Sequence, residues 1–352
     1  MITTRAWVGN WSAMRLPPRN GESLAARPAA LKRAHAPISI RAGSGTMVVR
    51  ALDWTADERA AYARDGFVVV RNLVDPSFCA ALKARYPALF AGRFETGIEP
   101  EIVPALYRED DASANTRWMT NAWRGDHTAA RLALDSGIGR AIATLNGWAG
   151  MRLLQDNAHW KPPGSPELSY HQDNSYHRWC DPAELSSCWV ALGPVARETG
   201  TVGYVRGSHL WPRLDIKAYE DRVAERNLRG FLDPKDARAH VRVAAEHAGV
   251  EPEFVPIELE PGSAVFFNGW VWHGSFANTT ASAHRHSFSV HGLRPECRFH
   301  PTDISPVWGR YKRFEETAMD EAVFPITWHS SGYRTPWLDA YVARGSGAAS
   351  AA

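Results

Sequence analysis

The stretch Ser169-Tyr-His-Gln-Asp-Asn-Ser-Tyr176 organises the predicted fold, because it places two potential metal ligands two residues apart. We expect a β-strand here, on which His171 and Asp173 leave the same face. With one further ligand, this imidazole and carboxylate would form the two-histidine, one-carboxylate triad that suits non-haem Fe(II). A His-x-Asp pair also arises by chance in a chain with 14 histidines, so the interpretation depends on residues further along.

The composition is that of a globular protein with an ample core: 352 residues, 45% apolar and 22% charged. A net charge of +2, without a basic run that contains aromatic residues, predicts no nucleic-acid partner. Because no segment reaches the roughly 18–20 apolar residues that span a bilayer, no membrane partner is expected. The four cysteines form no Cys-x-x-Cys pair, which favours reduced thiols and a cytoplasmic protein. A monomer and a homodimer are equally compatible with the sequence.

The two ends of the chain differ from its middle. Residues 1–46 contain six Arg and one Lys but a single acid, Glu22. We interpret this segment as a disordered extension or an incorrectly assigned start, with organellar targeting as a minor alternative. Residues 47–345 are predicted to form a single domain, and residues 346–352 a disordered tail. Within the domain, the charged and helix-prone residues 210–250 are predicted to be an insertion that acts as a lid.

The apolar pattern predicts helices first and strands afterwards. Helices are expected from Thr55 to Asp65, from Asp75 to Phe90 and within 127–148, with a buried strand at Phe67–Val74. From Met151 the period changes to two. Short strands are predicted at 151–160, 168–176, 186–195, 200–205, 255–259, 263–267 and 286–293. This density of strands predicts a mainly β fold with flanking helices, a double-stranded β-helix (jelly roll, cupin-like).

Two further motifs follow the His-x-Asp pair in the chain. An apolar strand leads into His273-Gly-Ser275, and twelve residues after His273 comes Arg285, at the start of the last strong strand. A guanidinium inside a mostly apolar barrel is costly unless it is paired. A carboxylate of a small diacid would pair with it in bidentate fashion. Taken together and in this order, the three motifs are poorly explained by chance.

The same motifs resemble the phytanoyl-CoA dioxygenase family of Fe(II)- and 2-oxoglutarate-dependent oxygenases. The resemblance covers about residues 55–295, with Arg206 in place of a proline that the family usually has. It is specific for the family and leaves the substrate open. The segments that carry it are Ala63–Val70, Lys161-Pro-Pro-Gly164, His171-Gln-Asp173, Trp189, Glu198-Thr-Gly200, Arg206-Gly-Ser-His209 and His273-Gly-Ser275 with Asn278.

The resemblance implies a role for each matched residue. His171, Asp173 and His273 would bind Fe(II), at which 2-oxoglutarate and O2 would react. Arg285 and Ser275 would hold the distal carboxylate of 2-oxoglutarate, and Trp189 would form a wall of that pocket. Gln155, Asn157, His159 and Lys161 are predicted to share one face of their strand, with Asn157 favoured over Lys161 as a further cosubstrate contact.

The expected reaction is oxidation of a small-molecule substrate. Halogenating relatives have Gly or Ala in place of the carboxylate ligand, so Asp173 favours hydroxylation, with desaturation or ring closure as variants. Four side chains near the motif would line a substrate pocket or fill the barrel: His159, Trp160, Tyr176 and Trp179. Two other classes remain open. A cupin-like isomerase or hydrolase would need the histidines but not Arg285, and an inactive jelly-roll binding module would be expected to have lost a ligand or the arginine.

Overall fold

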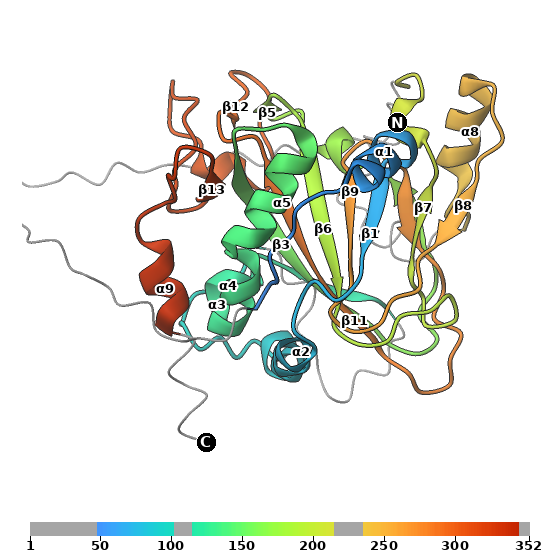
Figure 1. Ribbon diagram of the computed structural model, residues 1–352, viewed down its shortest axis with the longest axis horizontal. Helices are drawn as coiled ribbons and strands as arrows, with labels where there is room; N and C mark the ends of the chain where they lie inside the picture. The colour runs from blue at the N-terminus through green and yellow to red at the C-terminus, as the bar shows by residue number, and fades with distance from the viewer. Residues whose placement is uncertain (1–47, 102–114, 215–234, 345–352) are drawn as a thin grey trace, which may run out of the picture. The chain divides into compact units, whose positions relative to one another are not determined.

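A seven-stranded antiparallel sheet forms one half of the fold in the computed structural model, which describes residues 48–101, 115–214 and 235–344 (Figure 1). Its strands follow the order β1, β9, β6, β11, β3 and β13, and β2 also pairs with β3. The strands are β1 (Phe67–Val70), β2 (Arg117–Thr120), β3 (Gly150–Lys161), β6 (Leu185–Ala191), β9 (Ala264–Asn268), β11 (Arg285–Leu293) and β13 (Ile326–His329). The predicted N-terminal extension, the C-terminal tail and residues 215–234 of the predicted insertion lie outside the described residues.

A smaller antiparallel sheet packs against the inner face of the larger one. Its order is β4 (Leu168–His171), β10 (His273–Ser275), β7 (Val202–Val205) and β8 (Phe254–Pro256). Apolar side chains from both sheets meet between them, where Phe67 of β1 stacks on Tyr204 of β7 at a centroid distance of 4.9 Å. Two facing antiparallel sheets with crossed connections form a jelly roll, which confirms the fold class predicted from the strand pattern.

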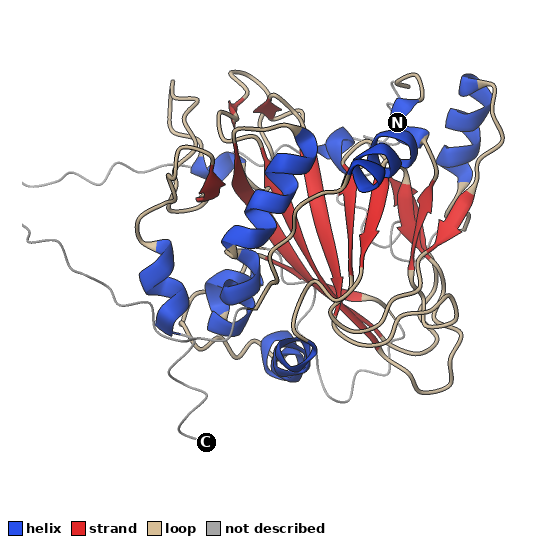
Figure 2. Cartoon of the chain, viewed as in Figure 1, coloured by secondary structure: helices blue, strands red, loops and turns tan. Residues whose placement is uncertain are grey.

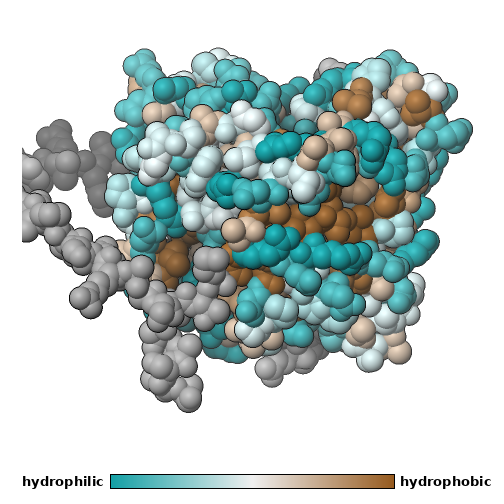
Figure 3. Space-filling model, in the orientation of Figure 1, coloured by the Kyte–Doolittle hydropathy of each residue, from teal (hydrophilic) through white to brown (hydrophobic). Residues whose placement is uncertain are grey.

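Helices cover the outer face of the larger sheet, as Figure 2 shows. Figure 3 shows apolar surface gathered over β6, β9 and β1, where the helices leave part of this face uncovered. Local capping signals determine where the first two helices begin. Thr55 makes a capping box with Glu58, and Asp75 caps a helix that begins at Pro76. The helices are α1 (Ala56–Asp65), α2 (Pro76–Phe90), α3 (Ala122–Gly125), α4 (His127–Ala133), α5 (Ser136–Asn146), α8 (Ala239–Ala248) and α9 (Leu338–Arg344).

Several predicted strands are shorter than expected; those predicted at 186–195 and 255–259, for example, end at Ala191 in β6 and at Pro256 in β8. The strand Phe67–Val74 ends at Val70, because Asn72 adopts a left-handed φ of 53° and the backbone of Leu73 and Val74 turns to hydrogen-bond with Gly262. The prediction of one strand over 168–176 was also wrong. β4 ends at His171, and residues Asp173–Tyr176 form the 3-10 helix η1. Asp173 is therefore the first residue of a turn, and it does not share a strand face with His171 as the sequence predicted.

The C-terminal segment packs back onto the body of the fold. Residues after Pro295 form β12 (Arg298–Phe299), which pairs with β5 (Cys180–Asp181), and the 3-10 helix η3 (Gly309–Tyr311). Elsewhere in the chain, the 3-10 helix η2 (Ser208–Leu210) follows β7. Trp308 and Phe324 join Trp179 in one apolar cluster. All four cysteines are buried and none forms a disulfide. Among the described residues, no helix has the length and apolar character needed to cross a membrane.

Candidate metal centre

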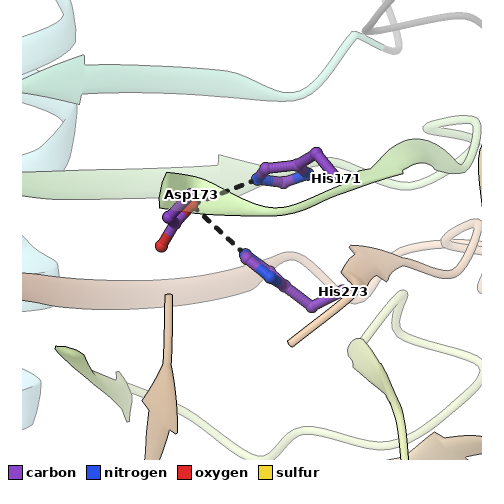
Figure 4. A group of neighbouring side chains, drawn as sticks. All are labelled: His171, Asp173 and His273. Carbon is purple, nitrogen blue, oxygen red and sulfur yellow. Dashed lines mark ion pairs between the residues drawn. The ribbon is translucent and has the colours of Figure 1, made fainter. Parts of the chain in front are cut away.

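Three predicted ligands converge at the inner side of the smaller sheet, where they face one another (Figure 4). His171 at the end of β4 is the direct cross-strand partner of His273 on β10. The Oδ1 atom of Asp173 lies 3.5 Å from Nε2 of His171 and 3.6 Å from Nε2 of His273. One donor atom from each residue lies within 4.8 Å of the other two, a separation at which one ion can contact all three.

The local backbone orients each ligand before any metal binds. Nδ1 of His171 lies 3.0 Å from the carbonyl oxygen of Ser169, and Nδ1 of His273 lies 3.1 Å from that of Val271. A proton on each Nδ1 leaves both Nε2 lone pairs available for a metal, the arrangement common to histidine ligands. The turn that carries Asp173 is held by the backbone of Asn174, which donates to the carbonyl of Gly269.

The turn also explains a glycine. Oδ1 of Asn174 accepts a hydrogen bond from the backbone of Leu185, 2.8 Å away. A Cβ atom at position 269 would lie 2.3 Å from that same Oδ1. Gly269 is therefore required for the close approach that places the turn, and with it Asp173, beside the two histidines.

The protonation states of His273 and Asp173 suit a divalent cation. Burial lowers the pKa of His273 to about 4, so its imidazole is neutral at pH 7. Burial alone would raise the pKa of Asp173, but the imidazoles of His273, His171 and His291 outweigh it and hold that pKa well below its usual range. An ionised carboxylate and a neutral imidazole are the forms in which these groups bind metal.

Two buried cations lie next to one another in the same inner space. Arg285 on β11 is the cross-strand partner of Lys161 on β3. Both side chains have a lowered pKa, and burial is the main cause in each case. Nζ of Lys161 donates to Ser275 Oγ at 3.0 Å and to the carbonyl of Pro166 at 2.6 Å. Arg285 donates to Ser287 Oγ at 2.7 Å, whereas its buried Nε has no partner among the described residues.

The other predicted cosubstrate contacts lie close to these cations or to the metal ligands. The guanidinium carbon of Arg285 lies 5.7 Å from the centroid of the Trp189 ring. Ser275 lies two residues after the ligand His273 on β10, and its Oγ accepts a hydrogen bond from Lys161. The Asn157 amide contacts two protein groups, Thr120 and His291.

The structure brings only part of the predicted substrate set together. The Tyr176 ring lies 5.9 Å from that of His171, and His159 lies on the inner face of β3 with Nδ1 buried and without a partner in the described part of the chain. Trp160 points to the opposite face of β3, where it packs against Phe90. Trp179 lies in the C-terminal aromatic cluster and donates to Nδ1 of His177 at 3.1 Å.

One residue beside Asp173 was missed by the sequence reasoning. His291 on β11 places Nδ1 3.5 Å from Oδ2 of Asp173. Its position could have been found from the period of two, because Arg285, Ser287, Ser289 and His291 occupy alternate positions of one strand. Since Arg285 was already expected to point inward, the same alternation would have placed His291 on the inner face, but this step was not taken.

Comparison with known proteins gives one family match. A family model described as phytanoyl-CoA dioxygenase (PhyH) matches residues 62–287. Among curated relatives, phytanoyl-CoA dioxygenase of Arabidopsis thaliana is 26% identical over 193 residues, which are 53% of this chain and 57% of that protein. The multifunctional dioxygenase ausE of Emericella nidulans is 24% identical over 152 residues, 42% of each chain. The chain thus spans about half the length of the curated relatives it matches.

Solved structures share the fold at low sequence identity. The epimerase SnoN from nogalamycin biosynthesis, in complex with Fe3+, alpha ketoglutarate and nogalamycin RO, superposes with a TM-score of 0.59 at 22% identity, over 77% of this chain and 98% of that one. EctD from S. alaskensis with 2-oxoglutarate and 5-hydroxyectoine gives a TM-score of 0.52 at 20% identity, over 80% and 96% of the two chains. At these identities the likeness establishes the jelly-roll architecture.

Proposed function

Because the chain belongs to the phytanoyl-CoA dioxygenase family, we propose that it is an Fe(II)- and 2-oxoglutarate-dependent dioxygenase. It oxidises an unactivated carbon of a small-molecule substrate and releases succinate and CO2. The family match over residues 62–287 includes all three metal ligands and Arg285. The bound metal supplies the activation of O2, and the protein supplies ligand geometry, cosubstrate orientation and the exclusion of water.

The metal would be held by Nε2 of His171, Nε2 of His273 and Oδ1 of Asp173. Two neutral nitrogens and one carboxylate oxygen form the donor set of non-haem Fe(II) oxygenases, and a carboxylate at this position favours oxidation by oxygen over halogenation. The donor chemistry therefore fits the proposed metal without any change in the side chains present.

The observation that carries the cosubstrate assignment is the pair of buried cations. Among the described residues, neither Arg285 nor Lys161 has a carboxylate within ion-pair distance, although both are at least nine-tenths buried. Two buried and uncompensated cations are costly, and an anion bound between them would remove that cost. The distal carboxylate of 2-oxoglutarate is such an anion, and the other end of that molecule would bind the metal.

Other side chains complete the proposed cosubstrate pocket. Ser275 orients the ammonium of Lys161 and would itself donate to the carboxylate, while Trp189 forms the wall beside Arg285. Asn157 is proposed to contact 2-oxoglutarate nearer the metal, by donating the amide hydrogen that does not face His291. A cupin-like isomerase or hydrolase would have no use for this cationic pocket, and this separates the oxygenase from that alternative.

The proposed substrate side of the centre carries His159 and Tyr176. Both lie near the metal ligands, and His159 retains a buried ring nitrogen without a partner among the described residues. A polar group on the substrate could satisfy that nitrogen. The lining is compatible with a small molecule that has an apolar body and one hydrogen-bonding group.

The decisive experiment is anaerobic loading with Fe(II) and 2-oxoglutarate, followed by exposure to oxygen and measurement of succinate by mass spectrometry. We expect one Fe(II) per chain and succinate release that rises when a pool of candidate small molecules is added. Asp173→Ala should lose both, whereas Asp303→Ala, which removes an exposed carboxylate, should lose neither. Iron binding without any succinate in the wild type would contradict the oxygenase assignment.

A further inference from the structure

A third histidine approaches the metal carboxylate from the opposite sheet. His291 belongs to β11 of the larger sheet, whereas the metal ligands belong to the smaller sheet and the turn η1. Its Nδ1 atom lies 3.5 Å from Oδ2 of Asp173 and 2.7 Å from Oγ of Ser187. The side chain is buried and is not a member of the three-residue ligand set.

A short hydrogen-bond chain determines which nitrogen of His291 carries the proton. The Thr120 hydroxyl donates to Oδ1 of Asn157 at 2.7 Å, so the amide directs Nδ2 toward His291, where Nδ2 lies 3.1 Å from Nε2. An amide NH2 group only donates, so Nε2 of His291 accepts. The proton of the neutral ring is then on Nδ1, and Nδ1–H faces Ser187 and Asp173.

The far oxygen of Asp173 needs such a donor. Oδ1 faces the two metal histidines, while Oδ2 is buried and has no hydrogen-bond partner among the residues that the structure describes. A buried carboxylate oxygen without a donor is costly. A shift of roughly 0.3–0.6 Å would bring Nδ1 of His291 within the usual N–H···O distance of Oδ2.

We propose that His291 is a positioning residue for the metal centre: Thr120 and Asn157 hold it as the Nδ1–H tautomer, and it holds the Asp173 carboxylate with Oδ1 toward the metal. This proposal rests on the metal site of the proposed function. Without the Nδ1–H donor, the carboxylate would be free to turn about its Cβ–Cγ bond, and each metal-binding event would have to order it again. Partners of metal-binding carboxylates commonly have this role.

The test compares metal affinity in three variants, measured by anaerobic titration with Fe(II) alone and, separately, with Co(II), whose visible absorption reports ligand geometry. His291→Leu removes the donor, and we expect the dissociation constant to rise about 10- to 100-fold with a changed Co(II) spectrum. His291→Asn keeps an N–H near the position of Nδ1 and should recover most of that loss, so its dissociation constant should lie clearly below that of His291→Leu. His286→Asn is the matched control, because His286 lies on the same strand but packs against Tyr86 on the other face; it should bind metal as the wild type does.

Each outcome has a separate meaning. If His291→Leu binds Fe(II) and Co(II) as tightly as the wild type with an unchanged spectrum, the positioning role is refuted. The role is also refuted if His291→Asn loses as much affinity as His291→Leu, because a preserved donor should matter. Thermal unfolding of the metal-free variants identifies a folding defect, in which case His291→Asn decides the question. A wild type that binds neither metal would instead refute the proposed metal site itself.

Discussion

We expect Arg285 to lower the free energy of unfolding of the metal-free protein and to raise its affinity for the cosubstrate. The variant Arg285→Met separates these two effects. Burial lowers the pKa of Arg285 from 12.5 to about 10. Because one pKa unit corresponds to about 1.4 kcal/mol, burial destabilises the charged guanidinium by roughly 3 kcal/mol. A methionine of similar length has no charge to bury. We therefore expect the metal-free Arg285→Met protein to unfold at the same urea concentration as the wild type or a higher one.

Cosubstrate binding should change in the opposite direction. A charge-assisted hydrogen bond contributes about 1.5–3 kcal/mol, which corresponds to roughly 10- to 150-fold in affinity. The dissociation constant of 2-oxoglutarate, titrated anaerobically into the Fe(II) protein, should rise by about this factor in Arg285→Met. The dissociation constant of Arg285→Lys should lie between those of the wild type and Arg285→Met, because lysine offers a charge without the planar fork of donors.

Arg152 provides a matched control. It is also a buried arginine on the larger sheet, but its guanidinium donates to the carbonyl oxygens of Phe324 and Pro295. Arg152→Met leaves those carbonyls without donors and should destabilise the protein without affecting 2-oxoglutarate. If Arg285→Met instead loses stability as Arg152→Met does, and binds 2-oxoglutarate like the wild type, then Arg285 is a structural residue and the cosubstrate is anchored elsewhere.

Three further predictions concern groups with shifted pKa values or metal contacts. A bound carboxylate raises the lowered pKa of Lys161, so 2-oxoglutarate affinity should fall as pH rises above the pKa of the free protein, by at most about tenfold per pH unit; in Lys161→Met a titration series should show no such slope. Burial lowers the pKa of His177 from 6.5 to about 4, so the unfolded chain binds more protons in that range and stability should fall by up to roughly 3 kcal/mol as pH drops from 6.5 to 4. Urea unfolding of His177→Gln at pH 7 and pH 4.5 should show a smaller difference than the wild type does, and equal differences would contradict the assignment. His171→Ala should lose Fe(II) stoichiometry in metal analysis while its circular dichroism stays native, and full iron occupancy would exclude His171 as a ligand.

Local signals in the sequence predicted much of the fold, because each had a direct physical cause. The capping box at Thr55 and the Asp75-Pro76 pair start helices where they were expected. The strand predicted over 286–293 is β11, which begins at Arg285 and is buried along almost its whole length. The three motifs in their chain order predicted the ligands that converge in space, which a single His-x-Asp pair could not have done.

What the sequence could not supply comes from contacts between distant segments. Asp173 lies at the start of a turn and not on a strand, because its neighbour Asn174 makes hydrogen bonds with residues 269 and 185. No local sequence pattern reveals these contacts. The pairing of Lys161 with Arg285 depends on the register between β3 and β11. Trp179 joins a cluster built from the C-terminal segment, so its surroundings depend on residues more than 100 positions away.

The two faces of β11 show why the alternation of a buried strand carries functional information. Phe288 and Val290 point into the helix-covered core, where apolar packing satisfies them. The intervening positions point between the sheets and carry polar groups, each of which must find a partner there. Asn157 and Ser289 contact Nε2 of His291, Nδ1 of the same ring faces Ser187 and Asp173, and Ser287 accepts a hydrogen bond from Arg285. In the described residues, the buried atoms left without a hydrogen-bond partner include Nε of Arg285 on this inner face and, opposite it on η1, Oδ2 of Asp173. One is a donor at the proposed cosubstrate pocket and the other is an acceptor at the metal ligands, so these two unsatisfied atoms belong to the two parts of the proposed site.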